Sequence, residues 1–269
     1  MNYFFKVLKA EMRKQHKNYF HSKIIYVSLF LWPVLTFISA YYNFKPFDLN
    51  NISIDYLNEG NLIVFVLIGY TCLLFFHSLI QSAWRFSFER ISGTLELIYL
   101  SPGNRLSFIM GNAATSLLEG VWLYVVFTFF ILLAKANDLK INGPAAFVSM
   151  LLIVVLALLW GMLLNSLFLF SRDSGFLFTI LQDPMELFSG VKIPTILFPQ
   201  WAKIISYFFP LTYSAELLRR AILNGESLQQ MKGLVIISII AAITMAITTI
   251  IALKCGEQHA KKTGNMALF

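Results

Sequence analysis

The chain has 269 residues, of which 58% are hydrophobic and only 13% are charged, with 26 phenylalanines and a formal net charge of +7. Soluble domains carry roughly a quarter charged residues, so this composition excludes an ordinary soluble protein and predicts an all-α, polytopic membrane protein. The basic residues flank apolar runs, which argues against binding to nucleic acid and favours contact with membrane lipids.

The first 23 residues are too charged to cross a membrane, but they predict an amphipathic helix. At about 100° of rotation per residue, one face carries the apolar side chains Phe4, Leu8, Met12 and Tyr19. The opposite face carries the basic side chains Lys6, Lys9, Arg13, Lys14 and Lys17. We expect residues 1–23 to lie in the membrane interface with the lysines towards lipid phosphates; an ordinary solvated helix is the alternative.

Six apolar runs are long enough to cross a membrane, since a spanning helix needs about 20 residues. They cover residues 24–42, 62–80, a stretch within 108–134, 145–170, a stretch from about 175, and 233–253. The first run is too long for a signal peptide and no cleavage site follows it. Six spans return both termini to one side, and the distribution of Lys and Arg predicts that this side is the cytoplasm.

The segment 188–225, before the last run, is apolar but is interrupted by Pro194, Pro199 and Pro210. Broken helices near a membrane occur where protein or water covers their backbone. This segment therefore predicts short re-entrant or interfacial helices on the outer side.

Three acidic residues fall within the predicted spans. Glu119 lies in the third, and Asp183 and Glu186 lie three residues apart in the fifth, on one helix face. Ionisable groups in a span are costly and mark substrate or proton pathways. The alternative is that they pair with a Ser, Tyr or Arg of a neighbouring helix, or lie near a span end.

No motif for chemistry is present in the sequence. It has no phosphate-binding loop, no HExxH, no GxSxG and no CxxC, and its four histidines are scattered. Cys72 and Cys255 indicate neither a disulfide framework nor a metal site. We expect no catalytic residue and no metal site, although an intramembrane enzyme stays an alternative.

The densest pattern of charge, Gly and Pro is "FERISGTLELIYLSPGNR", between the second and third runs. Residues 83–100 predict a helix that ends at Ser101-Pro102-Gly103, because Pro and Gly do not continue a helix. On the cytoplasmic side, such an amphipathic helix is a surface for binding another protein; a merely charged turn is the alternative.

This stretch resembles the E-x-x-x-G-T-x-E-x-L-x-x-x-P pattern of permease subunits of type 2 ATP-binding cassette (ABC) exporters. The pattern falls on Glu89, Gly93, Thr94, Glu96 and Pro102. A second stretch, "LFSGVKIPTILFPQWAKIISYFFPLTYSAELLRRAIL", is similar to the segment before the last span of these permeases. With the six spans and the amphipathic start, the resemblance covers nearly the whole chain.

The resemblance implies one transmembrane permease domain over residues 1–269. Residues 83–102 would be the coupling helix, which docks on a separate ABC ATPase through Glu89, Arg90 and Glu96, with Gly93 and Thr94 in the same motif. ATP and Mg²⁺ would bind to two copies of that ATPase, so this chain would hold no cofactor.

The resemblance also implies a second permease chain, in a homodimer or a heterodimer, in the bacterial cell membrane. The segment 188–225 would form an outer gate that includes Gly190, Pro194, Trp201, Pro210 and Tyr213. A path rich in Phe, Tyr and Leu favours an amphipathic cargo, so we expect export of a drug, an antimicrobial peptide or a lipid-like molecule. Lipid-linked glycan export is the alternative within this family, and an intramembrane enzyme or a scaffold is the alternative outside it.

Overall fold

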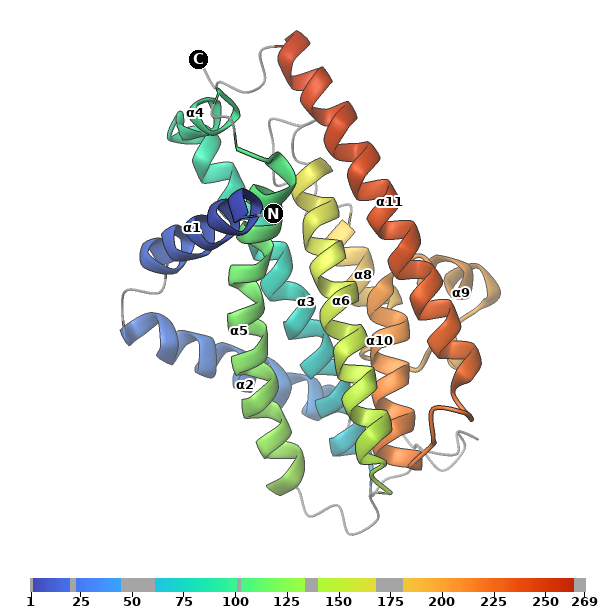
Figure 1. Ribbon diagram of the computed structural model, residues 1–269. Coiled ribbons are helices and arrows are strands. Elements are labelled where there is room, and N and C mark those ends of the chain that lie inside the picture. The colour runs from blue at the N-terminus through green and yellow to red at the C-terminus, as the bar shows by residue number, and fades with distance from the viewer. Residues whose placement is uncertain are drawn as a thin grey trace.

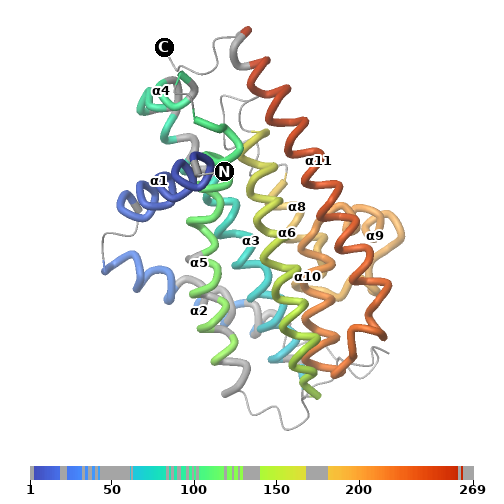
Figure 2. The backbone as a smooth tube through the Cα atoms, viewed as in Figure 1, coloured from blue at the N-terminus to red at the C-terminus, as the bar shows by residue number. Residues whose placement is uncertain are grey.

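The structure is a computed structural model that describes residues 2–19, 23–44, 61–100, 103–133, 140–167 and 181–263. All regular elements in these ranges are helices. Four long helices, α3, α5, α6 and α11, form the body of the molecule, with α1 and α2 on one flank and α8 to α10 on another (Figure 1). The tube in Figure 2 shows the same arrangement.

Four of the described helices are long and apolar enough to cross a membrane. They are α3 (Leu62–Ile91), α5 (Arg105–Leu133), α6 (Gly143–Leu167) and α11 (Lys232–Thr263). They account for the second, third, fourth and sixth predicted spans. The first predicted span is the 22-residue helix α2 (Lys23–Phe44), and most of the fifth falls on residues 168–180, outside the described part; both stay predictions as spans.

The helix α3 lies at the centre of the bundle. It packs against α5, α6 and α10, and nearly all of its side chains from Val64 to Phe76 are buried. A helix that is apolar on every side is stable only when it is surrounded. In contrast, α11 packs mainly on α6 and exposes a row of isoleucines: Ile236, Ile237, Ile239, Ile240, Ile243, Ile247, Ile250 and Ile251.

A buried polar network joins three of the long helices. The amide of Asn112 on α5 donates to the carbonyl of Ser82 on α3 (2.8 Å) and to Oδ1 of Asn165 on α6 (3.0 Å). Asn165 Nδ2 in turn donates to Ser82 Oγ (2.9 Å), and Arg85 Nη2 donates to Ser116 Oγ (2.8 Å). In apolar surroundings such bonds fix the register of the helices, because breaking one leaves a buried polar group without a partner.

The segment before α11 consists of short helices, as the prolines predict. They are α8 (Asp183–Phe188), the single turn η2 (Thr195–Leu197), α9 (Gln200–Ser206), α10 (Pro210–Arg219) and the wide turn η3 (Arg220–Asn224). Figure 1 shows α8 beside the long helices and α9 at the edge of the molecule. The position of the segment 188–225 on the outer side of a membrane stays a prediction.

The helix α1 (Asn2–Tyr19) forms as predicted and packs across α5. Lys6, Lys9, Arg13 and Lys17 are exposed, which confirms most of the predicted basic face. Lys14 is the exception, because its amine turns into the molecule and pairs with carboxylates.

Candidate functional site

The segment predicted as a single coupling helix over 83–102 is divided in two, which corrects that prediction. The helix α3 continues past the second span to Ile91, a turn follows at Ser92 and Gly93, and the short helix α4 (Thr94–Leu100) begins after it. Gly93 has a φ of +68°, and a Cβ at this position would meet no atom within 4 Å. The left-handed backbone, and not lack of space, therefore favours glycine here. Residues 101 and 102 lie outside the described part.

The Glu89 carboxylate holds this turn in place. Thr94 Oγ1 donates to Glu89 Oε2 (2.6 Å) and to the Glu89 carbonyl (3.0 Å), so α4 is bonded directly to the end of α3. The other carboxylate oxygen, Oε1, accepts from Lys14 Nζ (2.8 Å) and from Gln15 Nε2 (3.5 Å), both on α1. The Glu89 side chain is only 12% exposed, so its carboxylate faces α1 and the start of α4.

A second carboxylate, Glu11, lies on the buried face of α1. It accepts a hydrogen bond from Gln15 Nε2 (2.7 Å) and pairs with Lys14 (3.0 Å). Burial raises the pKa of Glu11 above its ordinary value of 4.5, although the nearby Lys14 ammonium opposes the shift. A Cβ on Gly111 of α5 would lie 2.9 Å from the Glu11 Cβ, so glycine allows α1 to approach α5 closely. Three elements therefore meet at this end of the bundle: α1, the end of α3, and α4.

Of the five residues in the predicted coupling motif, Glu89, Gly93 and Thr94 are fully described and lie together. The side chains of Arg90 and Glu96 lie outside the described part. Their contact with an ATPase, like that of Glu89, stays a prediction.

The predicted gate segment is anchored to α3 by Arg219, which the sequence reasoning did not place among the functional residues. The Arg219 guanidinium is buried and donates to the carbonyls of Gly190 (2.7 Å) and Val191 (2.9 Å). It also lies 3.6 Å from the ring centroid of Phe65 on α3. These contacts tie the start of the predicted gate segment, its end and the N-terminal part of α3 to one another.

Two of the predicted gate residues have structural roles near this anchor. Gly190 has a φ of +79°, a conformation that side chains with a Cβ rarely adopt. Pro194 is buried and precedes the turn η2. Both residues shape the loop whose carbonyls Arg219 binds.

The remaining gate residues divide into buried and exposed groups. Pro210 is buried at the first position of α10, and the Tyr213 hydroxyl donates to the Tyr207 carbonyl (2.6 Å). In contrast, Trp201 is 60% exposed and contacts the ring of Phe188 edge-on, with 5.8 Å between ring centroids. Trp201 is therefore available to a second chain, a substrate or lipid, whereas the other two hold the segment together.

The three acidic residues predicted inside spans do not form a cluster in the described part. Asp183 is exposed, and Glu186 forms an ion pair with Lys192 in the loop that follows (2.6 Å). The helix that carries both residues ends at Phe188. Glu119 lies in α5, but its side chain is outside the described part.

The contacts among the described residues fix helices and turns to one another; they do not assemble a metal-binding cluster. Within the described ranges, no group of three His, Cys, Asp or Glu side chains is placed to hold a metal ion. The geometry supplies a turn at one end of α3, fixed to α1 by the ion pair between Lys14 and Glu89, and a predicted gate segment fixed to the other end of α3 by Arg219.

Comparison with known proteins identifies the family that has these features. A family model described as "ABC-2 type transporter" matches residues 6–223, which is most of the chain. The match begins within α1 and ends within the turn η3, so it includes the turn at Ser92 and Gly93 and the predicted gate segment as far as residue 223. No curated protein matches the chain.

Proposed function

Because the chain belongs to the ABC-2 type transporter family, it is a transmembrane subunit of an ABC-type transport system, and we propose that it exports an amphipathic molecule from the cytoplasm. The membrane domain of this family is the permease part of the transporter and typically lacks an ATPase site. Its members normally work with ABC ATPase subunits. The proposed cargo is a drug, an antimicrobial peptide or a lipid-like molecule.

The observation that carries this proposal is the anchored turn formed by Phe88–Leu100, which we call the coupling turn. Its Glu89 faces inward to Lys14, Gln15 and Thr94. Three of its described side chains are large, apolar and exposed: Phe88 is 44% exposed, Leu97 is 68% and Leu100 is 82%. Exposed apolar groups beside polar ones are typical of a surface that binds another protein.

This arrangement refines the predicted contact with the ATPase. Leu97 and Leu100 would fill a groove on that subunit, with Arg90 and Glu96 as polar contacts at its edge. Glu89 would not contact the ATPase; it would hold the turn against α1 and α3. A movement of the ATPase that displaces the turn would then also displace α1 and α3, because these contacts join them to the turn.

The helix α3 would carry the movement towards the outer side. It has 30 residues, so it is about 45 Å long, and it runs from the coupling turn to the anchor of Arg219 on Phe65. Between those ends, Ser82 binds Asn112 and Asn165 on the neighbouring helices. Movement of the turn would therefore displace α3 together with α5 and α6 and release the gate segment.

The complete transporter would contain two ATPase copies, which bind ATP and Mg²⁺, and a second permease chain that encloses the path. The second chain would be another copy of this protein or a related permease. The assembly would lie in a bacterial cell membrane with both termini of this chain in the cytoplasm, as the positions of Lys and Arg favour.

The test is co-purification in detergent with a candidate ABC ATPase, chosen because its gene lies next to the gene for this chain. We expect Leu97→Ala with Leu100→Ala to weaken the complex at least about tenfold, since two exposed leucines would lose their pocket. The matched control is Leu151→Ala, which removes an exposed leucine from the middle of α6. Equal recovery of the ATPase with all variants would refute the assigned docking surface, and no binding by the wild type would refute the proposed function.

A further inference from the structure

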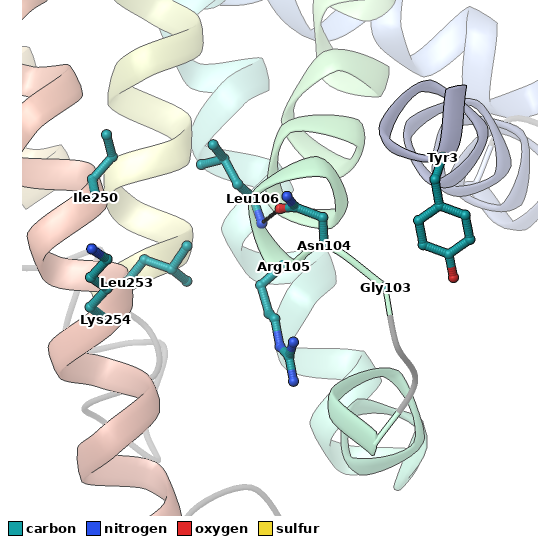
Figure 3. Close-up of a pocket in the computed structure, with 8 residues that line it drawn as sticks. All are labelled: Tyr3, Gly103, Asn104, Arg105, Leu106, Ile250, Leu253 and Lys254. Carbon is teal, nitrogen blue, oxygen red and sulfur yellow. Dashed lines mark hydrogen bonds between the residues drawn. The ribbon is translucent and has the colours of Figure 1, made fainter. Parts of the chain in front are cut away.

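A cavity of about 510 Å³ lies at the end of the bundle that carries the coupling turn. Its lining comes from three regions far apart in the sequence: the start of α1, residues 103–106 at the start of α5, and the second half of α11. Figure 3 shows Arg105 at the start of α5, between Lys254 of α11 and Tyr3 of α1. Its volume is within the range of about 300–1,000 Å³ that small-molecule sites occupy.

The cavity combines two cations with an apolar wall. Arg105 and Lys254 both line it, and no acidic residue is among its described lining residues. Leu106, Ile250 and Leu253 supply the apolar part. A ligand that fits this lining has an anionic group at one end and hydrocarbon at the other, because the anion then pairs with the two cations and the hydrocarbon contacts the apolar side chains.

The helix that supplies Arg105 favours an anion at the same place. Asn104 precedes α5 and its Oδ1 accepts from the backbone N–H of Leu106 (2.9 Å), so Asn104 caps the helix. Arg105 therefore stands in the first turn of a 29-residue helix, where the helix dipole already contributes positive charge. An anion beside Arg105 would be attracted by both the guanidinium and the helix dipole.

The position of the cavity indicates which anion is available. Ile250, Leu253 and Lys254 belong to the last turns of the apolar stretch Lys232–His259, where a span passes from hydrocarbon to water. The neighbouring helix α1 carries the exposed basic side chains Lys6, Lys9, Arg13 and Lys17. Basic pockets between transmembrane helices at this depth suit the headgroups of acidic lipids.

We propose that this cavity binds an anionic phospholipid of the membrane, with the phosphodiester between Arg105 and Lys254 and an acyl chain along Leu106, Ile250 and Leu253. The lipid joins α11 to α1 and α5, whereas the described contacts of α11 are mainly with α6 and α10. Gly103 and Asn104 come soon after α4, so the bound lipid also fixes the chain leaving the coupling turn. This site does not depend on an ATPase, and it is testable on the isolated chain.

The experiment is native mass spectrometry of the full chain in detergent, titrated with phosphatidylglycerol or phosphatidylcholine. We expect the wild type to retain one phosphatidylglycerol and to prefer it over phosphatidylcholine. The double variant R105Q/K254Q is expected to bind phosphatidylglycerol about 25-fold more weakly, at about fivefold for each basic side chain near an anionic headgroup. The control Lys232→Gln removes an exposed lysine from the other end of α11 and is expected to leave binding within about twofold.

Two further arms separate the alternatives. If R105Q/K254Q does not fold, the single variant Lys254→Gln, at an exposed position, is expected to weaken binding about fivefold by itself. Inorganic phosphate at millimolar concentration is expected not to displace the lipid, because it lacks the hydrocarbon that contacts Leu253. Displacement by phosphate would assign the site to a soluble anion, and equal binding of both lipids or an unaffected double variant would overturn the proposal.

Discussion

The ion pair between Lys14 and Glu89 is expected to stabilise the docking of α1 measurably. The Nζ and Oε1 atoms are 2.8 Å apart, and the side chains are 34% and 12% exposed. Fully exposed pairs contribute about 0–1 kcal/mol, and hydrogen bonds to charged groups in less exposed places about 1.5–3 kcal/mol. For this half-buried pair we expect a coupling energy of about 1–2 kcal/mol.

A double-mutant cycle with Lys14→Ala and Glu89→Ala measures that coupling. Glu89→Ala alone is expected to cost more than the pair itself, about 2–3 kcal/mol, because Thr94 and Gln15 also lose an acceptor. The assay is reversible unfolding in mixed detergent micelles, together with hydrogen exchange of α1. Lys17→Ala, at an exposed position of the same helix, is the control and is expected to change the unfolding free energy by less than about 0.5 kcal/mol.

Additivity of the two single variants would refute this reasoning. If the double variant lost the sum of the two effects to within about 0.5 kcal/mol, the contact would contribute nothing of its own. Unchanged hydrogen exchange in α1 would likewise show that Glu89 does not hold that helix.

Three further predictions concern other contacts of the bundle. Gly69→Ala would place a Cβ 2.5 Å from Arg219 Nη2 and 2.7 Å from the Val191 carbonyl, so the free energy of unfolding, measured by thermal unfolding in detergent, should fall by about 1–3 kcal/mol. The control is Gly233→Ala, where a Cβ would meet no atom within 4 Å, and it should be neutral or stabilising. Asn165→Ala leaves the buried amide of Asn112 without one partner and should cost about 1–3 kcal/mol in the same assay. Burial raises the pKa of Glu11 in the folded state, so the folded chain binds its proton more tightly than the unfolded chain and stability should fall as pH rises above about 4.5; Glu11→Gln should remove that slope from unfolding measured between pH 4 and pH 8.

The sequence predicted helices well where a long apolar run determines them, but it did not predict which spans are central. The spans in α3 and α11 have similar mean hydropathies of 2.3 and 2.7, yet 89% of the first and 17% of the second are buried within the molecule. Lipid tails and a protein interior are both apolar, so hydropathy alone does not distinguish the two surroundings. The polar signal was available in Ser82, Asn112 and Asn165, which lie in the predicted apolar runs or directly after one.

The coupling turn shows a second limit of sequence reasoning. Gly93 is compatible with a helix at modest cost, so the pattern alone favoured one continuous helix. The break becomes favourable because the Thr94 hydroxyl bonds to both the carbonyl and the carboxylate of Glu89. Such side-chain bonds to nearby groups compete with the regular helix.

The direction in which Glu89 faces depends on a contact that spacing does not reveal. Lys14 and Gln15 lie more than 70 positions before it, so only the folded chain brings them together. Arg219 is a similar case, since its acceptors are backbone carbonyls of the loop at Gly190, and carbonyls carry no sequence signal. The motif identified the right region, and the tertiary contacts decide what each residue in it does.

These contacts give α3 a different kind of attachment at each end. At the coupling turn it is held by charged side chains that lie partly exposed, with Lys14 34% exposed. At the predicted gate segment it is held by a buried guanidinium beside Phe65, close to Gly69, where there is no room for a methyl group. Polar contacts near water rearrange at lower cost than buried ones, because water replaces the lost partners. A load on the coupling turn should therefore change the contacts of α1 first, and the gate should follow only when α3 moves as a rigid body.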